Sequence, residues 1–145
     1  MNNMDPEVRR KVSDWLSYGD EDLRLARHAL TLTSACPYRL IAYHAQQCAE
    51  KHLKAYLVFH GIDFPYTHNI SRLLELCAER AGWTESLQDA EELTAFATAV
   101  RYPGMEESVT RTEALRSIEI ASRVREVVRT ALSQEGLRVP EGEGR

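Results

Sequence analysis

Amide, acid and amine side chains are concentrated in residues 46–55, which read Gln-Gln-Cys-Ala-Glu-Lys-His-Leu-Lys-Ala. On a helix, four polar side chains of this region fall in one arc beside the apolar face: His44, Gln47, Lys51 and Lys54. Amide and cationic groups can donate hydrogen bonds to an anion, so this arc is a candidate site. The simpler alternative is that Glu50 and Lys54 form an exposed ion pair and that the glutamines are only solvated.

A second candidate group is formed by Arg101 and Tyr102, directly before Pro103 and Gly104. Proline and glycine end a helix, so the guanidinium of Arg101 can bind either the last helical carbonyl groups or a phosphate. Tyr102 can close the end of a helical bundle with its ring. We expect the arc and Arg101 to converge on one anion-accepting pocket.

The composition excludes several classes of protein. A net charge of −4 over 145 residues argues against a protein that binds nucleic acid over its whole surface, because such binding neutralises phosphates with many Lys and Arg residues. The three cysteines lack the spacing of zinc sites, so we expect reduced thiols, no metal and no cofactor. No apolar run approaches about 18 residues and no signal pattern is found near Met1, which predicts a cytoplasmic protein without membrane contact.

Helical periodicity extends through most of the chain and predicts an all-α, up-and-down bundle of four to five helices. Asp5 and Pro6 begin a helix that continues to Leu30, and a second helix follows from Pro37 to Gly61 and packs antiparallel to it. Three further helices are expected at about residues 69–76, 84–100 and 110–132.

Residues 1–133 therefore form a single domain, and residues 134–145 have too few apolar side chains to fold and form a disordered tail. Thr110 and Glu113 have the spacing of a capping box, which places the start of the last helix. The arginines of that helix alternate with glutamates and are predicted to form a solvated, ion-paired face rather than an RNA track.

Several separated motifs resemble the HEPN domain, a helical module named for nucleotide binding in higher eukaryotes and prokaryotes. In chain order, the matching residues are Trp15, Asp22-Leu23, residues 46–55, Thr67-His68 and Arg101-Tyr102-Pro103. The departures are Cys48 and His52, where alanines are usual, and Phe96 near a position that often carries tyrosine. The resemblance is to the nucleotidyltransferase-associated type and implies a homodimer that binds nucleotide or RNA. The nucleotide-binding residues that it implies are Gln47, Lys51, Lys54, Arg101 and Tyr102.

Many HEPN proteins that cut RNA carry an arginine followed four to six residues later by a histidine, and Arg39 with His44 has this spacing. That pair lies at the start of the second helix, whereas the family's motif is normally late in the domain, where Arg101 has no such histidine. In metal-independent cleavage, a histidine takes the proton of the 2′-hydroxyl group and an arginine faces the charge that develops on the phosphate. His44 is the first choice for this histidine and His68 the second.

Two hypotheses of different kinds follow. The first is a HEPN homodimer that binds nucleotide or RNA and acts with a separately encoded minimal nucleotidyltransferase. The second is a metal-independent endoribonuclease of toxin type that uses His44 or His68 with Arg39 or Arg101. We favour the first, because the nuclease spacing is misplaced. Leu53 and Leu57 lie away from the main apolar stripe of the second helix, which we interpret as a surface for the partner chain.

Overall fold

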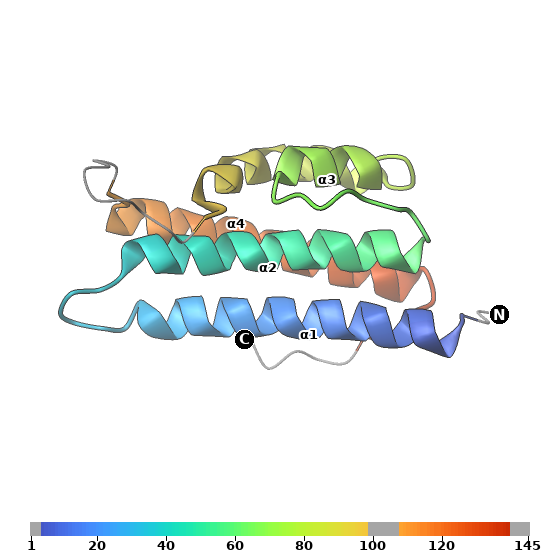
Figure 1. Cartoon of the computed structure of the whole chain (residues 1–145), viewed down its shortest axis with the longest axis horizontal. Helices are drawn as coiled ribbons and strands as arrows, with labels where there is room; N and C mark the ends of the chain where they lie inside the picture. Colours follow the sequence, from blue (N-terminus) through green and yellow to red (C-terminus); the bar gives the residue numbers. More distant parts are fainter. Residues whose placement is uncertain (1–3, 99–107, 140–145) are drawn as a thin grey trace.

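The computed structural model describes residues 4–98 and 108–139, and helices dominate both ranges (Figure 1). The elements are α1 (Pro6–Ala29), α2 (Tyr38–Phe59), α3 (Ile70–Cys77), the 3₁₀ segment η1 (Gly82–Phe96) and α4 (Arg111–Gln134). No strand occurs in the two described ranges. The predicted all-helical bundle is therefore confirmed.

Local sequence signals account for the helix ends. The Asp5 side chain accepts a hydrogen bond of 2.8 Å from the amide of Glu7 and so caps α1. Thr110 and Glu113 form the predicted capping box at the start of α4. Gly61 follows the end of α2 with a φ of 65°, a left-handed conformation that glycine adopts without steric cost.

The chain path brings the segment after α2 back along that helix. α1 and α2 are antiparallel, and the extended crossover of residues 60–69 returns along α2 to about its middle before α3 begins (Figure 1). As a result α3 and α4 run in the same direction as α2, and η1 runs against them (Figure 1). The crossover is anchored where Gln46 donates a hydrogen bond of 3.1 Å to the carbonyl oxygen of His68. His68 is thereby placed beside the polar face of α2.

The fourth helix differs from its prediction, because it is a 3₁₀ segment with a kink at Leu87 and ends at Phe96. The hydroxyl groups of Thr84 and Ser86 donate to carbonyl groups three residues earlier, at distances of 3.2 and 2.7 Å. Such bonds compete with regular α-helical pairing. Every third side chain then faces the interior, as a 3₁₀ helix requires, and these are the buried Leu87, Ala90 and Leu93.

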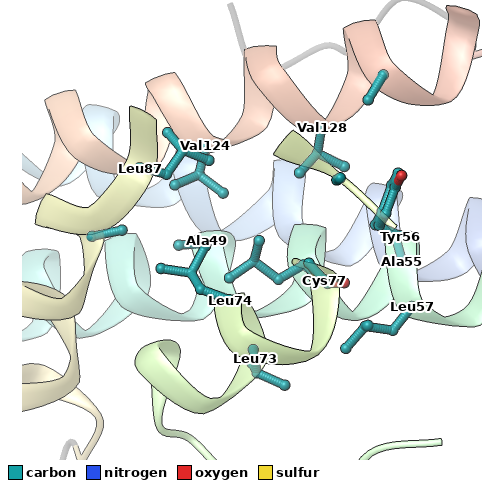
Figure 2. Close-up of a cluster of buried hydrophobic side chains, with 14 of the residues drawn as sticks. Ala49, Ala55, Tyr56, Leu57, Leu73, Leu74, Cys77, Leu87, Val124 and Val128 are labelled. Carbon is teal, nitrogen blue, oxygen red and sulfur yellow. Dashed lines mark hydrogen bonds between the residues drawn. The ribbon is translucent and has the colours of Figure 1, made fainter. Parts of the chain in front are cut away.

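The main apolar core joins side chains of α2, α3, η1 and α4, which gather in Figure 2, and Val12 and Leu16 of α1 also belong to it. A smaller cluster joins α1, α2 and α4. Leu53 and Leu57 are both fully buried within the larger cluster. The interpretation of these two leucines as a surface for a partner chain is therefore wrong, because α3 and η1 of the same chain already cover that side of α2.

Part of the expected tail packs against the bundle. The Tyr56 hydroxyl group donates a hydrogen bond of 2.8 Å to Glu135, and Leu137 is buried. These contacts of one leucine and one carboxylate lie beyond residue 133 and were not indicated by the composition. The division into a domain of residues 1–133 and a tail stays a prediction. Residues 140–145 lie outside the described ranges, where the tail stays a prediction. None of the helices in the described ranges combines the length and apolarity of a membrane span.

Candidate functional site

The polar arc of α2 is divided between two groups of side chains. α1 packs beside one edge of the arc and the crossover of residues 60–69 beside the other. The first, the Asp22 group, consists of Asp22, His44 and Lys51. The second, the Glu50 group, consists of Glu50, Gln46, Gln47, Lys54 and His68.

In the Asp22 group, one carboxylate from α1 bridges two side chains of α2. Nδ1 of His44 lies 2.7 Å from Oδ1 of Asp22, and Nζ of Lys51 donates to Oδ2 of the same carboxylate at 2.6 Å. His44 and Lys51 are seven residues apart, two helical turns, so they lie on one face of α2 opposite antiparallel α1. Their side chains are 26% and 23% exposed, which leaves both accessible to a solute.

In the Asp22 group, the carboxylate of Asp22 can orient the imidazole ring of His44. When Nδ1 of His44 donates to Asp22, the ring orientation is held and Nε2 remains for a ligand or a proton. Lys51 adds a positive charge on the same edge. The sequence indicated His44 and Lys51, but it did not identify Asp22 as their common partner, since the three residues meet only when α1 packs on α2.

In the Glu50 group, a buried carboxylate is surrounded by donors. Oε1 of Glu50 accepts hydrogen bonds from Gln46 at 3.0 Å and from Nδ1 of His68 at 2.8 Å, while Oε2 pairs with Nζ of Lys54 at 2.8 Å. Burial raises the pKa of Glu50, but the hydrogen bonds from Lys54, Gln46 and His68 outweigh it and leave this pKa lowered. Glu50 is therefore held as a carboxylate inside the protein.

The Glu50 group engages two of the residues predicted to bind nucleotide. Nζ of Lys54 also lies over the rings of Trp15 and Phe64, 5.5 and 5.6 Å from their centroids. Gln47 donates a hydrogen bond of 2.7 Å to the side-chain oxygen of Gln46. The Glu50–Lys54 pair is buried, so the interpretation as an exposed pair is wrong: the crossover covers it. Within this group the side chain of His68 is the most accessible, at 41% exposed.

The structure does not bring all predicted site residues together. Arg39 is half-buried in the first turn of α2. A separation of five residues rotates two side chains by about 140° around a helix, so Arg39 and His44 lie on different faces. Arg101 and Tyr102 lie outside the described residues. Their convergence with the arc stays a prediction.

A buried ionic network, which we name the Asp20 network, consists of Asp20, Arg125, Arg129 and His52. Asp20 accepts hydrogen bonds of 2.7 Å from Nε of Arg125 and 2.5 Å from Nη2 of Arg129. Burial raises the pKa of Asp20, but His52, whose Nε2 lies 3.5 Å away, the hydrogen bond from Arg125 and the charge of Arg129 outweigh burial and lower this pKa strongly.

The prediction that the arginines of α4 lie on a solvated face is wrong for Arg125 and Arg129, because both side chains are largely buried. The signal in the sequence was the spacing of Arg125, which follows Ala121 by four residues and Ile118 by seven and so falls on the apolar stripe of α4. Arg116 does lie on the solvated face as predicted, where it forms two hydrogen bonds of 2.6 Å with Glu92 of η1.

His52 is packed inside the bundle, as its apolar position predicted, and its Nδ1 lies 2.8 Å from the Cys48 carbonyl oxygen. All three cysteines are unpaired, and burial raises the pKa of the Cys77 thiol to about 12. Cys77 is thus an inert thiol rather than a nucleophile. Within residues 4–98 and 108–139, no group of three or more His, Cys, Asp or Glu side chains is arranged to hold a metal ion.

Comparisons with known proteins agree with the helical architecture. A model of the HEPN domain family matches residues 12–131. The crystal structure of ST0689, an archaeal HEPN homologue, is 31% identical in sequence, with a TM-score of 0.67 over 83% of this chain and 97% of its own. The crystal structure of TT1696 from Thermus thermophilus is 27% identical, with a TM-score of 0.66 over the same shares of the two chains. No protein of curated function matches the chain.

Proposed function

Because the chain belongs to the HEPN domain family, we propose that it binds nucleotide or RNA as a homodimer and acts with a separately encoded minimal nucleotidyltransferase, in a pair of toxin–antitoxin type. The resemblance of residues 46–55, Thr67-His68 and Arg101-Tyr102-Pro103 to the nucleotidyltransferase-associated type supports the partnership.

The Asp22 group is the observation that carries the binding proposal. Lys51 and His44 present an amine and an imidazole at one partly exposed edge of α2. A phosphate that approaches this edge can accept a hydrogen bond from Lys51 in place of the Asp22 carboxylate. Such a local site is compatible with the net charge of −4, which does not favour a generally basic surface.

Exposed apolar side chains on α1 support association with a second chain. Tyr18 and Leu25 are 50% and 51% exposed, and their spacing of seven residues puts them on one face of the helix. A homodimer that packs these faces together would bury them. Leu25→Glu is then expected to shift sedimentation from dimer to monomer at micromolar concentration, while the exposed Leu115→Glu on α4 leaves the dimer intact. A monomer before any substitution would refute the homodimer.

The binding proposal is tested with fluorescently labelled single-stranded RNA and with ATP, by anisotropy and calorimetry. Lys51→Ala is expected to weaken binding about tenfold or more, because it removes a charge-assisted hydrogen bond. Lys11→Ala is the matched control, since Lys11 is exposed on α1. Equal losses in the two variants would show that only overall charge matters and would refute the site.

The nucleotidyltransferase partnership needs its own test. We expect the chain to be retained by an immobilised minimal nucleotidyltransferase encoded in a neighbouring reading frame when the two are co-expressed. A neighbouring frame of that kind whose product does not retain the chain would contradict the partnership and leave the binding proposal untouched.

The contact between Asp22 and His44 also favours the second candidate function, a metal-independent endoribonuclease. A carboxylate that orients a histidine is what a general base requires, and Nε2 of this partly exposed ring could take the proton of a 2′-hydroxyl group. Incubation of single-stranded and structured RNA with the purified protein in EDTA tests this candidate. Fragments that vanish with His44→Ala but persist with the exposed His28→Ala would establish the enzyme, and intact RNA would exclude it.

A further inference from the structure

A hollow of about 330 Å³ lies between the start of α1 and the turn after α4. The start of α1 and the end of α4 lie at the same end of the bundle (Figure 1). It is lined by Met4, Arg9, Gly136, Leu137 and Arg138. None of these residues belongs to the Asp22 group or the Glu50 group. We propose that this hollow is a second binding site, specific for a phosphomonoester of about mononucleotide size.

The turn after α4 places Arg138 at the hollow. Gly136 has a φ of 101°, which reverses the chain, and the amides of Gly136 and Leu137 donate to the carbonyl groups of Ser133 and Leu132 at 3.2 and 2.9 Å. The side chain of Leu137 is buried in the main core and anchors the turn. Arg138 therefore follows a fixed turn rather than a free chain end.

The charges at the hollow are unbalanced. Arg9 and Arg138 are both exposed, and within the described ranges neither forms an ion pair with a carboxylate. The neighbouring Arg10, in contrast, pairs with Glu7 on the outer face of α1. Two exposed arginines that line one cavity and have no counterion in the described structure are suited to bind an anion of charge near −2.

The size and the apolar lining define the class of ligand. A phosphomonoester carries about −1.5 to −2 charges at pH 7, whereas a carboxylate carries one, so the two arginines favour the phosphate. Ligand pockets of small organic molecules begin at about 300 Å³, which is room for a group larger than phosphate alone. Met4 supplies apolar surface for the organic part, and its flexible thioether can pack on a ring.

Calorimetry of the full chain with AMP, inorganic phosphate, adenosine and succinate tests the proposal. We expect AMP to bind most tightly, phosphate more weakly, and adenosine and succinate at least about tenfold more weakly than AMP, since one charged hydrogen bond is worth that factor. Arg9→Gln and Arg138→Gln should each weaken AMP binding about tenfold or more. Arg10→Gln is the matched control, because it removes the same charge from the next residue without touching the hollow.

Three results would overturn the proposal: no AMP binding at millimolar concentration, unchanged binding in both Arg9→Gln and Arg138→Gln, or an equal loss in Arg10→Gln. Arg138 is exposed and follows the last helix, so its substitution keeps the test valid even where Arg9→Gln impairs folding. If Arg9→Gln and Arg138→Gln leave AMP binding unchanged and Lys51→Ala weakens it, AMP binds at the Asp22 group, which refutes the second site and supports the first.

Discussion

Oε2 of Glu50 and Nζ of Lys54, one helical turn apart in sequence, lie 2.8 Å from each other. Both side chains are buried, although the surrounding sequence is strongly polar. An exposed pair at this spacing contributes a few tenths of a kcal/mol. A buried pair behaves differently, since each charge depends on the other to offset its desolvation. The stability of the bundle should therefore depend on Glu50 far more than on its surface carboxylates.

Glu50→Gln is expected to lower the free energy of unfolding by about 3–5 kcal/mol, because it leaves the ammonium of Lys54 buried without a counterion. Urea unfolding followed by circular dichroism measures this loss. Glu92→Gln is the matched control, since it removes the same charge from an exposed pair with Arg116, and it should leave the transition midpoint within error. Similar losses in the two variants would show that burial of the Glu50–Lys54 pair has no energetic consequence.

Acid should destabilise the protein through Asp20. The folded protein lowers the pKa of this carboxyl group, whereas the unfolded chain binds the proton near pH 4. The stabilisation is therefore complete above about pH 4 and is lost as the pH falls toward the folded pKa. Urea midpoints at pH 7, 5, 4 and 3 measure this loss, and Asp20→Asn should lower stability at pH 7 and make the fall in acid shallower. Asp14→Asn, at a partly exposed position of the same helix, should retain the steep fall of the parent protein. An Asp20→Asn protein with the parent's acid profile would contradict the assignment.

Gly19 permits the close approach of α1 to α2. A Cβ atom at this position would lie 2.7 Å from Nδ1 of His52, a ring that is fully buried. Gly19→Ala should therefore lower the free energy of unfolding by about 1–3 kcal/mol, as overpacked cores do. Gly82→Ala is the control, because an added Cβ there meets no atom within 4 Å. A Gly19→Ala protein as stable as the parent would show that His52 can move at no cost.

Asp22→Asn should distinguish the two candidate functions, because it is expected to strengthen RNA binding at a binding site but to slow cleavage by a nuclease. For a binding site, neutralising Asp22 removes a competitor for Lys51 and should strengthen binding of single-stranded RNA several-fold. For a nuclease, the same change weakens the orientation of His44 and should slow cleavage about tenfold or more. Anisotropy measures the first quantity, and fragment formation in EDTA measures the second. Weaker RNA binding in this variant would mean that Asp22 holds Lys51 in place instead of competing for it.

Helix ends and the predicted α-helical fold class could be read from the sequence because they depend on neighbours a few residues apart. Asp5 caps α1 and Thr110 caps α4 through bonds that span two or three residues. The same local argument failed for η1, where the Thr84 and Ser86 hydroxyl groups favoured the tighter 3₁₀ turn. The side-chain types and their helical spacing predicted the polar arc of α2, and its role as an anion site stays a prediction.

Only the tertiary structure decided which polar residues of that arc are accessible. The crossover covers Glu50 and Lys54 and leaves His68 partly exposed, whereas α1 supplies Asp22 to His44 and Lys51. These pairings join residues 18 to 29 positions apart. Helical periodicity determines the face of the helix on which a side chain lies. Whether that side chain is solvated depends on which segment packs against the face, and this packing is determined by the apolar core as a whole.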